Sequence, residues 1–238
     1  QDYVASAGTH LLVDPLPRWN DPSQSLACLL RADPADACAA LLDARPTPGP
    51  ASWAALFDKL EASVAVAGGS EHWLPALFSS LPPGQAVFVG NSLPIRQLDS
   101  FSGTAARPLR FFANRGASGI DGNVSTALGI ATVTGSVVAI VGDLTCQHDI
   151  GGLALARGLN AAIIVVNNGG GRIFDHLPQA ALPEFERAWR TPQDIDFAAA
   201  ARTFGIAHAR CEAIGELCSA VRAALQAGGP HLVELIEA

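Results

Sequence analysis

Short apolar runs and helical repeats alternate along the first third of the chain. Two runs are typical of short strands, and residues 35–44 place apolar side chains at helical spacing. The strands are HLLVD (10–14) and LACLL (26–30). Two strands and one helix are too few for a doubly wound sheet, so residues 1 to about 45 are predicted to form only a partial unit.

A proline-rich segment separates this part from the rest. RPTPGP (45–50) holds three prolines and one glycine, which favour a linker, and the pattern over 51–67 is helical. We therefore expect a linker and helix at 49–69. The remaining residues, 70–238, are predicted to form one regular domain.

Buried strands and helices alternate regularly from residue 70 onward. The predicted strands are AVFVG (86–90), RFFA (110–113), VVAIVG (137–142), AAIIVV (161–166) and HLVELIE (231–237). The predicted helices are 70–81, 123–132, 149–159, 196–204 and 212–226. Continuous apolar strands between helices are typical of a parallel sheet covered on both faces. The fold class is therefore predicted to be α/β, with a doubly wound, mostly parallel sheet.

Composition excludes several classes of protein. The chain has 238 residues, of which 49% are hydrophobic and 16% charged, as in a compact globular protein. Its formal net charge of -7 disfavours nucleic-acid binding. No apolar run is long enough to span a membrane. The five cysteines form no CxxC pair, so we expect neither a zinc site nor disulfides, and we expect a cytoplasmic location.

Polar residues follow four of the predicted strands directly. They are Asn91-Ser92, Asn114-Arg115, Asp143 and Asn167-Asn168. Ligands of open parallel sheets bind beyond the carboxyl ends of the strands, and all four strand ends should lie at one edge. The sequence thus predicts a binding site at this edge.

The last two strand ends suggest a metal and a diphosphate. Asp143, Asn168 and a carbonyl of the glycine loop at 169–171 offer hard oxygen ligands of the kind that Mg²⁺ prefers. Glycines let the backbone approach a phosphate closely. Alone, each motif is more often a turn, a helix cap or a loop. Their pairing across one β-α-β unit is more specific.

The motifs resemble those of thiamine-diphosphate (ThDP) enzymes. A GD pair followed about two dozen residues later by NN resembles the ThDP signature, whose usual third residue is Gly where this chain has Leu144. The SEPHCHC synthase family, of the menaquinone pathway, commonly has GDL followed by Ser or Thr. Five segments of this chain resemble the sequences of that family: GNSLPIRQLD (90–99), ANRGASGIDGNVSTALG (113–129), VGDLTCQHDIGGLALAR (141–157), NNGGGRIFDHLPQ (167–179) and FERAWRTPQDIDFAAAA (185–201).

This resemblance implies roles for particular residues. Asp143, Asn168 and Gly170 would hold Mg²⁺ or Mn²⁺. The residues implied in cofactor binding are Ile120, Gly142, Asp143, Leu144, Thr145, Asn168, Gly170 and Gly171. Ser92, Arg96 and Arg115 would contact substrate carboxylates, for which guanidinium groups are well suited. Ile173 and Phe174 would line the substrate pocket.

The resemblance also implies a reaction and an assembly. The family is a ThDP- and metal-dependent transferase that decarboxylates 2-oxoglutarate and adds the succinyl-semialdehyde carbanion to isochorismate, giving SEPHCHC. Its full chain has a pyrimidine-binding domain that supplies the activating Glu, then a middle domain, then the diphosphate-binding domain, and its sites form between subunits. Residues 1–48 would be the end of the middle domain, and residues 70–238 would be the diphosphate- and metal-binding domain. We therefore expect this chain to be a carboxy-terminal part, to be inactive alone, and to belong to a homodimer or homotetramer.

Alternatives remain for the function and for single residues. Another ThDP enzyme of 2-oxo acids, such as an acetolactate-synthase-like protein, or a non-catalytic domain with the same fold would share part of the pattern. A dinucleotide-binding oxidoreductase ranks last because the GxGxxG fingerprint is absent. Arg96 could be a surface residue, and Ile120, Ile173 and Phe174 could be core residues. His148 and His176 stay unassigned.

Overall fold

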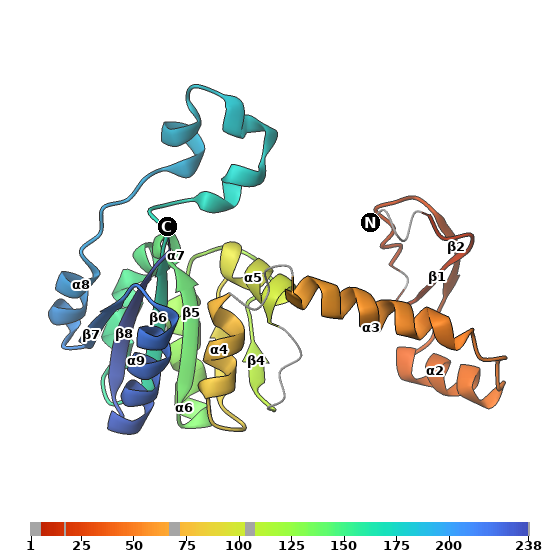
Figure 1. Cartoon of the computed structure of the whole chain (residues 1–238), viewed down its shortest axis with the longest axis horizontal. Coiled ribbons are helices and arrows are strands. Elements are labelled where there is room, and N and C mark those ends of the chain that lie inside the picture. Colours follow the sequence, from red (N-terminus) through yellow and green to blue (C-terminus); the bar gives the residue numbers. More distant parts are fainter. Residues whose placement is uncertain (1–5, 17, 67–71, 103–107, 238) are drawn as a thin grey trace. The chain divides into compact units, whose positions relative to one another are not determined.

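The computed structural model describes residues 6–16, 18–66, 72–102 and 108–237 (Figure 1). Residue 67 of one predicted helix and residues 70 and 71 of the next lie outside the described residues. Contacts within the chain define two compact units, Gln1–Leu60 and Glu61–Ala238. The assignment of the first unit to the end of a middle domain stays a prediction.

The first unit pairs its two strands in parallel. Strand β1 (His10–Val13) lies beside β2 (Leu26–Leu30). Helix α2 (Pro34–Asp43) begins with a proline, and the carboxylate of Asp33 caps it by accepting from the Ala35 N–H at 2.8 Å. Helix α3 (Ala51–Val66) follows in the chain. None of the described residues of this unit is buried, so the part of it that the structure describes has no core of its own.

The second unit is built on a six-stranded sheet. The strands are β3 (Ala86–Val89), β4 (Arg110–Phe112), β5 (Val137–Gly142), β6 (Ala161–Asn167), β7 (Ala207–Cys211) and β8 (Pro230–Ile236). Their order is β4-β3-β5-β6-β8-β7, and every neighbouring pair is parallel. All carboxyl ends therefore lie at one edge, as predicted.

Helices cover both faces of this sheet, which confirms the doubly wound α/β fold (Figure 1). The α-helices are α4 (Trp73–Ser80), α5 (Leu93–Phe101), α6 (Asn123–Thr134), α7 (Asp143–His148), α8 (Phe197–Phe204) and α9 (Ile214–Ala227). Ala139 and Val141 of β5 pack towards α6, whereas Val138 and Ile140 pack in the core with α4 and α9. Both faces of β5 and β6 are buried, which explains their continuous apolar runs.

The helix predicted at 149–159 differs from the one observed. α7 begins at Asp143, and the short 3₁₀ helix η2 occupies Ile150–Ala156. Gly152 of η2 packs closely against its neighbours, because a Cβ there would lie 2.5 Å from the Ser125 hydroxyl and 2.8 Å from an Asp149 carboxylate oxygen. Asp149 instead caps α6, accepting from the Ser125 N–H at 2.7 Å and from its hydroxyl at 3.0 Å.

The segment between β6 and α8 contains short single turns. They are η3 (Arg172–His176), η4 (Pro178–Ala181) and η5 (Glu186–Arg190), of which η5 has π-helical hydrogen bonding. Arg190 ties η5 to η3 by an ion pair with Asp175 at 3.0 Å and pairs with Glu186 at 2.6 Å. Arg190 is thus a structural residue of this segment.

Candidate functional site

A small cavity lies at the carboxyl ends of β5 and β6. Its volume is about 120 Å³, and we call it the strand-end cavity. It is lined by Ser92, Leu93, Pro94, Ile120, Gly142, Asp143, Leu144, Thr145, Val166, Asn168, Gly170, Gly171, Arg172, Ile173 and Phe174. The structure thus brings together all eight residues predicted to bind the cofactor, and also three of the five predicted to bind substrate. Their roles stay predictions.

Asp143 is the buried carboxylate of this cavity. It is the first residue of α7, and it is only 3% exposed. One carboxylate oxygen accepts from the Leu144 N–H at 2.7 Å, and the other accepts from the Gly170 N–H at 2.8 Å. Burial raises the pKa of Asp143, while the backbone N–H groups of Leu144 and Gly170 oppose that rise. A cation beside Asp143 would remove the cost of burying its charge.

Asn168 lines the same cavity and has a buried amide oxygen. Among the described residues this Oδ1 has no hydrogen-bond partner. The backbone carbonyl of Asn168 is held separately, because it accepts from Arg172 Nε at 2.8 Å. An unpaired buried polar atom lowers the stability of the fold by about 1–3 kcal/mol. This oxygen is therefore suited to accept a hydrogen bond from a ligand or to coordinate a cation.

The glycine loop next to Asn168 needs its glycines. Gly169 and Gly170 have φ angles of +80° and +135°, which side chains rarely adopt. A Cβ at Gly170 would lie 2.5 Å from the Arg190 carbonyl oxygen, and the Gly171 N–H donates to that same oxygen at 2.7 Å. Thr191 also lies against Gly170. The backbone of 190–192 therefore supports the loop, and no pattern in the sequence indicates this contact.

The carboxyl ends of β3 and β4 hold the predicted arginines. Arg115 Nη1 donates to Asn91 Oδ1 at 2.8 Å, and Arg96 Nη1 donates to the carbonyl of Ser92 at 2.8 Å. Both arginines are exposed and line a second cavity of about 700 Å³, which we call the arginine cavity. They do not line the strand-end cavity, although Ser92 does.

Ser92 has an unusual backbone. Its φ of +75° and ψ of −133° lie in a region that residues other than glycine seldom occupy. Ser92 directly precedes α5, and its side chain does not cap that helix. Backbone strain of this kind is common at ligand sites. This backbone conformation could not be predicted from the sequence, because the sequence pattern around a strained serine does not differ from that around an unstrained one.

Comparison with known families identifies the second unit. A family model described as "Thiamine pyrophosphate enzyme, C-terminal TPP binding domain" matches residues 99–235, more than half of the chain. The chain belongs to this family. The matched residues include the ends of β5 and β6 and every residue that lines the strand-end cavity except Ser92, Leu93 and Pro94.

Curated relatives confirm the resemblance to SEPHCHC synthases. The 2-succinyl-5-enolpyruvyl-6-hydroxy-3-cyclohexene-1-carboxylate synthase of Dechloromonas aromatica is 55% identical over 95% of this chain and 42% of its own length. The synthase of the same name from Geobacillus thermodenitrificans is 39% identical over 91% of this chain and 39% of its own length. The chain spans about two fifths of the length of these relatives.

Solved structures share the fold. Benzoylformate decarboxylase from Polynucleobacter necessarius aligns over 69% of this chain and 32% of its own, with 20% identity and a TM-score of 0.56. A putative thiamin diphosphate-dependent enzyme from Mycobacterium smegmatis aligns over 74% of this chain and 32% of its own, with 25% identity and a TM-score of 0.52.

The strand-end cavity fits a metal-bound diphosphate. The unpaired Asn168 Oδ1 and the buried Asp143 carboxylate are both hard oxygen donors. Within the described ranges, no three His, Cys, Asp or Glu side chains cluster in a way that could hold a metal. The predicted ligand set has one carboxylate, one amide and one carbonyl, which suits a Mg²⁺ ion that takes its remaining ligands from phosphate and water.

Two histidines near the motifs lie outside this cavity. His148 Nδ1 is 3.3 Å from the Asp121 carboxylate, a partner 27 residues away that the sequence could not reveal. His176 lines a third cavity, of about 530 Å³, together with Arg96 and Arg172. Neither histidine forms a hydrogen bond with Asp143 or Asn168, and both stay unassigned.

None of the described helices is long and apolar enough to cross a membrane.

Proposed function

We propose that this chain is the cofactor-diphosphate part of a SEPHCHC synthase. The complete enzyme would decarboxylate 2-oxoglutarate and add the resulting succinyl-semialdehyde carbanion to isochorismate. The names of the curated relatives support this reaction. The observation that carries the proposal is the strand-end cavity, where a buried carboxylate and an unpaired amide oxygen meet a glycine loop.

Asp143, Asn168 and the Gly170 carbonyl would hold Mg²⁺ or Mn²⁺. Bound there, ThDP would supply the nucleophilic carbon and the electron sink for decarboxylation. The protein's own task at this end would be electrostatic, because a metal held by Asp143, Asn168 and Gly170 would offset the charge of a diphosphate. Gly142, Leu144, Thr145, Gly171 and Ile120 line the same cavity and would surround the cofactor.

The arginines would hold the substrates. Both proposed substrates carry carboxylates, and a charged hydrogen bond to a guanidinium contributes about 1.5–3 kcal/mol. Arg96 and Arg115 each donate to one oxygen of their own chain, which leaves further guanidinium N–H groups for a ligand. Ser92 reaches the strand-end cavity and would link the two regions. Ile173 and Phe174 would exclude water from it.

We infer the rest of the enzyme from the family resemblance, since the chain spans about two fifths of the length of its relatives. The pyrimidine-binding domain with its activating Glu would come from the rest of the full-length protein, and the assembly would be a homodimer or homotetramer. A cytoplasmic location belongs to the same proposal. The chain described here would fold its second unit and lack catalytic activity.

A kinetic assay of the full-length protein tests the proposed reaction. With ThDP, Mg²⁺, 2-oxoglutarate and isochorismate, we expect isochorismate to be consumed, and we expect no consumption when 2-oxoglutarate is omitted. Turnover of pyruvate in place of 2-oxoglutarate, without consumption of isochorismate, would instead indicate an acetolactate-synthase-like enzyme. Binding of ThDP without turnover of either acid would indicate a non-catalytic domain.

A further inference from the structure

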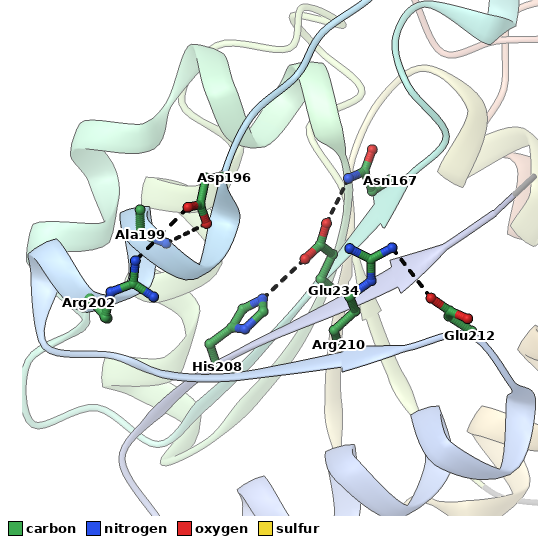
Figure 2. Close-up of polar contacts among 8 residues, drawn as sticks. All are labelled: Asn167, Asp196, Ala199, Arg202, His208, Arg210, Glu212 and Glu234. Atoms are coloured by element: carbon green, nitrogen blue, oxygen red, sulfur yellow. Dashed lines mark hydrogen bonds and ion pairs between the residues drawn. The ribbon is translucent and has the colours of Figure 1, made fainter.

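A buried carboxylate lies behind the glycine loop and has no part in the proposed function. Glu234, in β8, is 6% exposed. Its Oε1 accepts from Asn167 Nδ2 at 2.7 Å, and its Oε2 lies 3.2 Å from His208 Nε2 of β7. Figure 2 shows Glu234 between these two partners. Both carboxylate oxygens are therefore paired, as a buried charge requires.

Asn167 links Glu234 to the glycine loop. Its Oδ1 accepts from the Gly169 N–H at 3.3 Å, and its backbone carbonyl accepts from the Glu237 N–H at 3.0 Å. The Gly170 N–H, one residue further along, donates to Asp143. A continuous path of hydrogen bonds and backbone thus runs from Glu234 to the buried carboxylate of the strand-end cavity.

The chemistry of the pair fixes the orientation of the Asn167 amide. An ionised carboxylate only accepts hydrogen bonds, so the NH₂ group of Asn167 must face Glu234. The amide oxygen then faces the turn, where it accepts from the exposed Gly169 N–H at 3.3 Å. A flipped amide would place two acceptors together at Glu234 and two donors together at Gly169.

We propose that Glu234 is a positioning residue for the loop at 168–170. It acts through Asn167 to set the turn that carries Asn168 and Gly170, the residues assigned to the metal. The inference rests on the proposed function only for what the loop binds. His208 completes the arrangement by occupying the second oxygen of Glu234.

The test reverses the donor and the acceptor of the pair. Asn167→Asp alone places two carboxylates in contact and should weaken the loop. Adding Glu234→Gln restores a complementary pair: the Gln amide donates to the new carboxylate, whose other oxygen still accepts from Gly169. Glu234→Gln alone should be mild, because its Oε1 can still accept from Asn167.

Two measurements on the full-length protein follow these variants. The first is amide hydrogen exchange of Gly169 and Gly170 without cofactor, and the second is the affinity for Mn²⁺ in the presence of ThDP. For Asn167→Asp we expect about tenfold or more faster exchange and about tenfold or more weaker Mn²⁺ binding, since a hydrogen bond to a charged group is lost. In the double variant both should return to within about threefold of the Glu234→Gln level.

Two further variants separate positioning from general stability. Asp196→Ala removes the cap of α8, a carboxylate contact with the Ala199 N–H at 2.8 Å that Figure 2 also shows, and should leave both readouts unchanged. Asn167→Ala removes the acceptor of Gly169 without adding charge, and should speed exchange even if Asn167→Asp does not fold.

Two results would overturn the inference. One is a double variant as impaired as Asn167→Asp alone, and the other is Asn167→Ala with unchanged exchange at Gly169. Failure of wild-type protein to bind Mn²⁺ with ThDP would instead overturn the proposed function. The exchange measurement would still decide the positioning role of Glu234 in that case.

Discussion

The carboxyl ends of β5 and β6 and those of β3 and β4 lie at one sheet edge but differ in how their polar groups are satisfied. At β5 and β6, Asp143 is buried and Asn168 Oδ1 has no partner among the described residues. At β3 and β4, Arg96 and Arg115 are exposed and already donate to their own chain. We therefore propose that the first region is pre-organised for a cation, whereas the arginines of the second keep their internal contacts and offer their remaining N–H groups to a substrate.

Asp143→Ala tests the pre-organised region and should have the largest effect. Removing the only carboxylate of the predicted metal site leaves an amide and a carbonyl, which do not balance a divalent charge. We expect the affinity of the full-length protein for ThDP with Mg²⁺ to fall by about a hundredfold or more, since breaking a buried charge pair costs about 3–5 kcal/mol. Calorimetric titration measures this, and unchanged affinity would make Asp143 a turn residue only.

Substitution of the arginines tests the other region and should leave the cofactor bound. Arg115→Ala and Arg96→Ala should each raise the KM for a dicarboxylate substrate about ten- to hundredfold, from about 1.5–3 kcal/mol per contact. Arg→Lys at the same positions keeps the charge and loses the bidentate geometry, so it should recover only part of the loss. Steady-state kinetics with both substrates varied decides this. Wild-type constants in both alanine variants would refute the substrate role.

Ser92 tests whether strain is stored between the two regions. Ser92→Gly should increase the free energy of unfolding by about 1 kcal/mol, because glycine adopts a φ of +75° without a steric penalty. Ser92→Ala is the matched control, since it removes the hydroxyl and keeps the strained backbone. Urea denaturation compares the two variants. Equal stability of both would show that the backbone at Ser92 stores no strain.

Cys146 gives the smallest expected effect, and it tests the buried region at the carboxyl ends of β5 and β6. It lies on α7 three residues after Asp143, and burial, followed by the charges of Asp149 and Asp143, raises its pKa to about 12. In native protein we expect iodoacetamide to modify the exposed Cys28 and Cys38 and to leave Cys146 unmodified. Mass spectrometry of the labelled peptides measures this. Modification of Cys146 at the rate of Cys28 would show that the region opens readily.

The sequence predicted the regions that depend on local pattern. Apolar runs at 137–142 and 161–166 indicated buried parallel strands, and the polar residues that follow them indicated the site. The helix predicted at 149–159 is a shorter 3₁₀ helix at 150–156, and apolar spacing does not distinguish that helix type from an α-helix.

Contacts between distant residues left no trace in the pattern. Glu234 and Asn167 are 67 residues apart, and a glutamate within an apolar strand reads as an ordinary surface position. The packing of Gly170 against Arg190 depends in the same way on how a loop folds back. Residue types at strand ends thus predict which chemistry is present, while the supporting contacts require the folded chain.

Anomalous X-ray diffraction from crystals of the full-length protein grown with ThDP and Mn²⁺ would locate the metal. We expect one strong manganese peak coordinated by the Asp143 carboxylate, Asn168 Oδ1 and the Gly170 carbonyl oxygen, with the diphosphate in the strand-end cavity. A manganese peak with other protein ligands, or a diphosphate bound away from the ends of β5 and β6, would contradict this expectation.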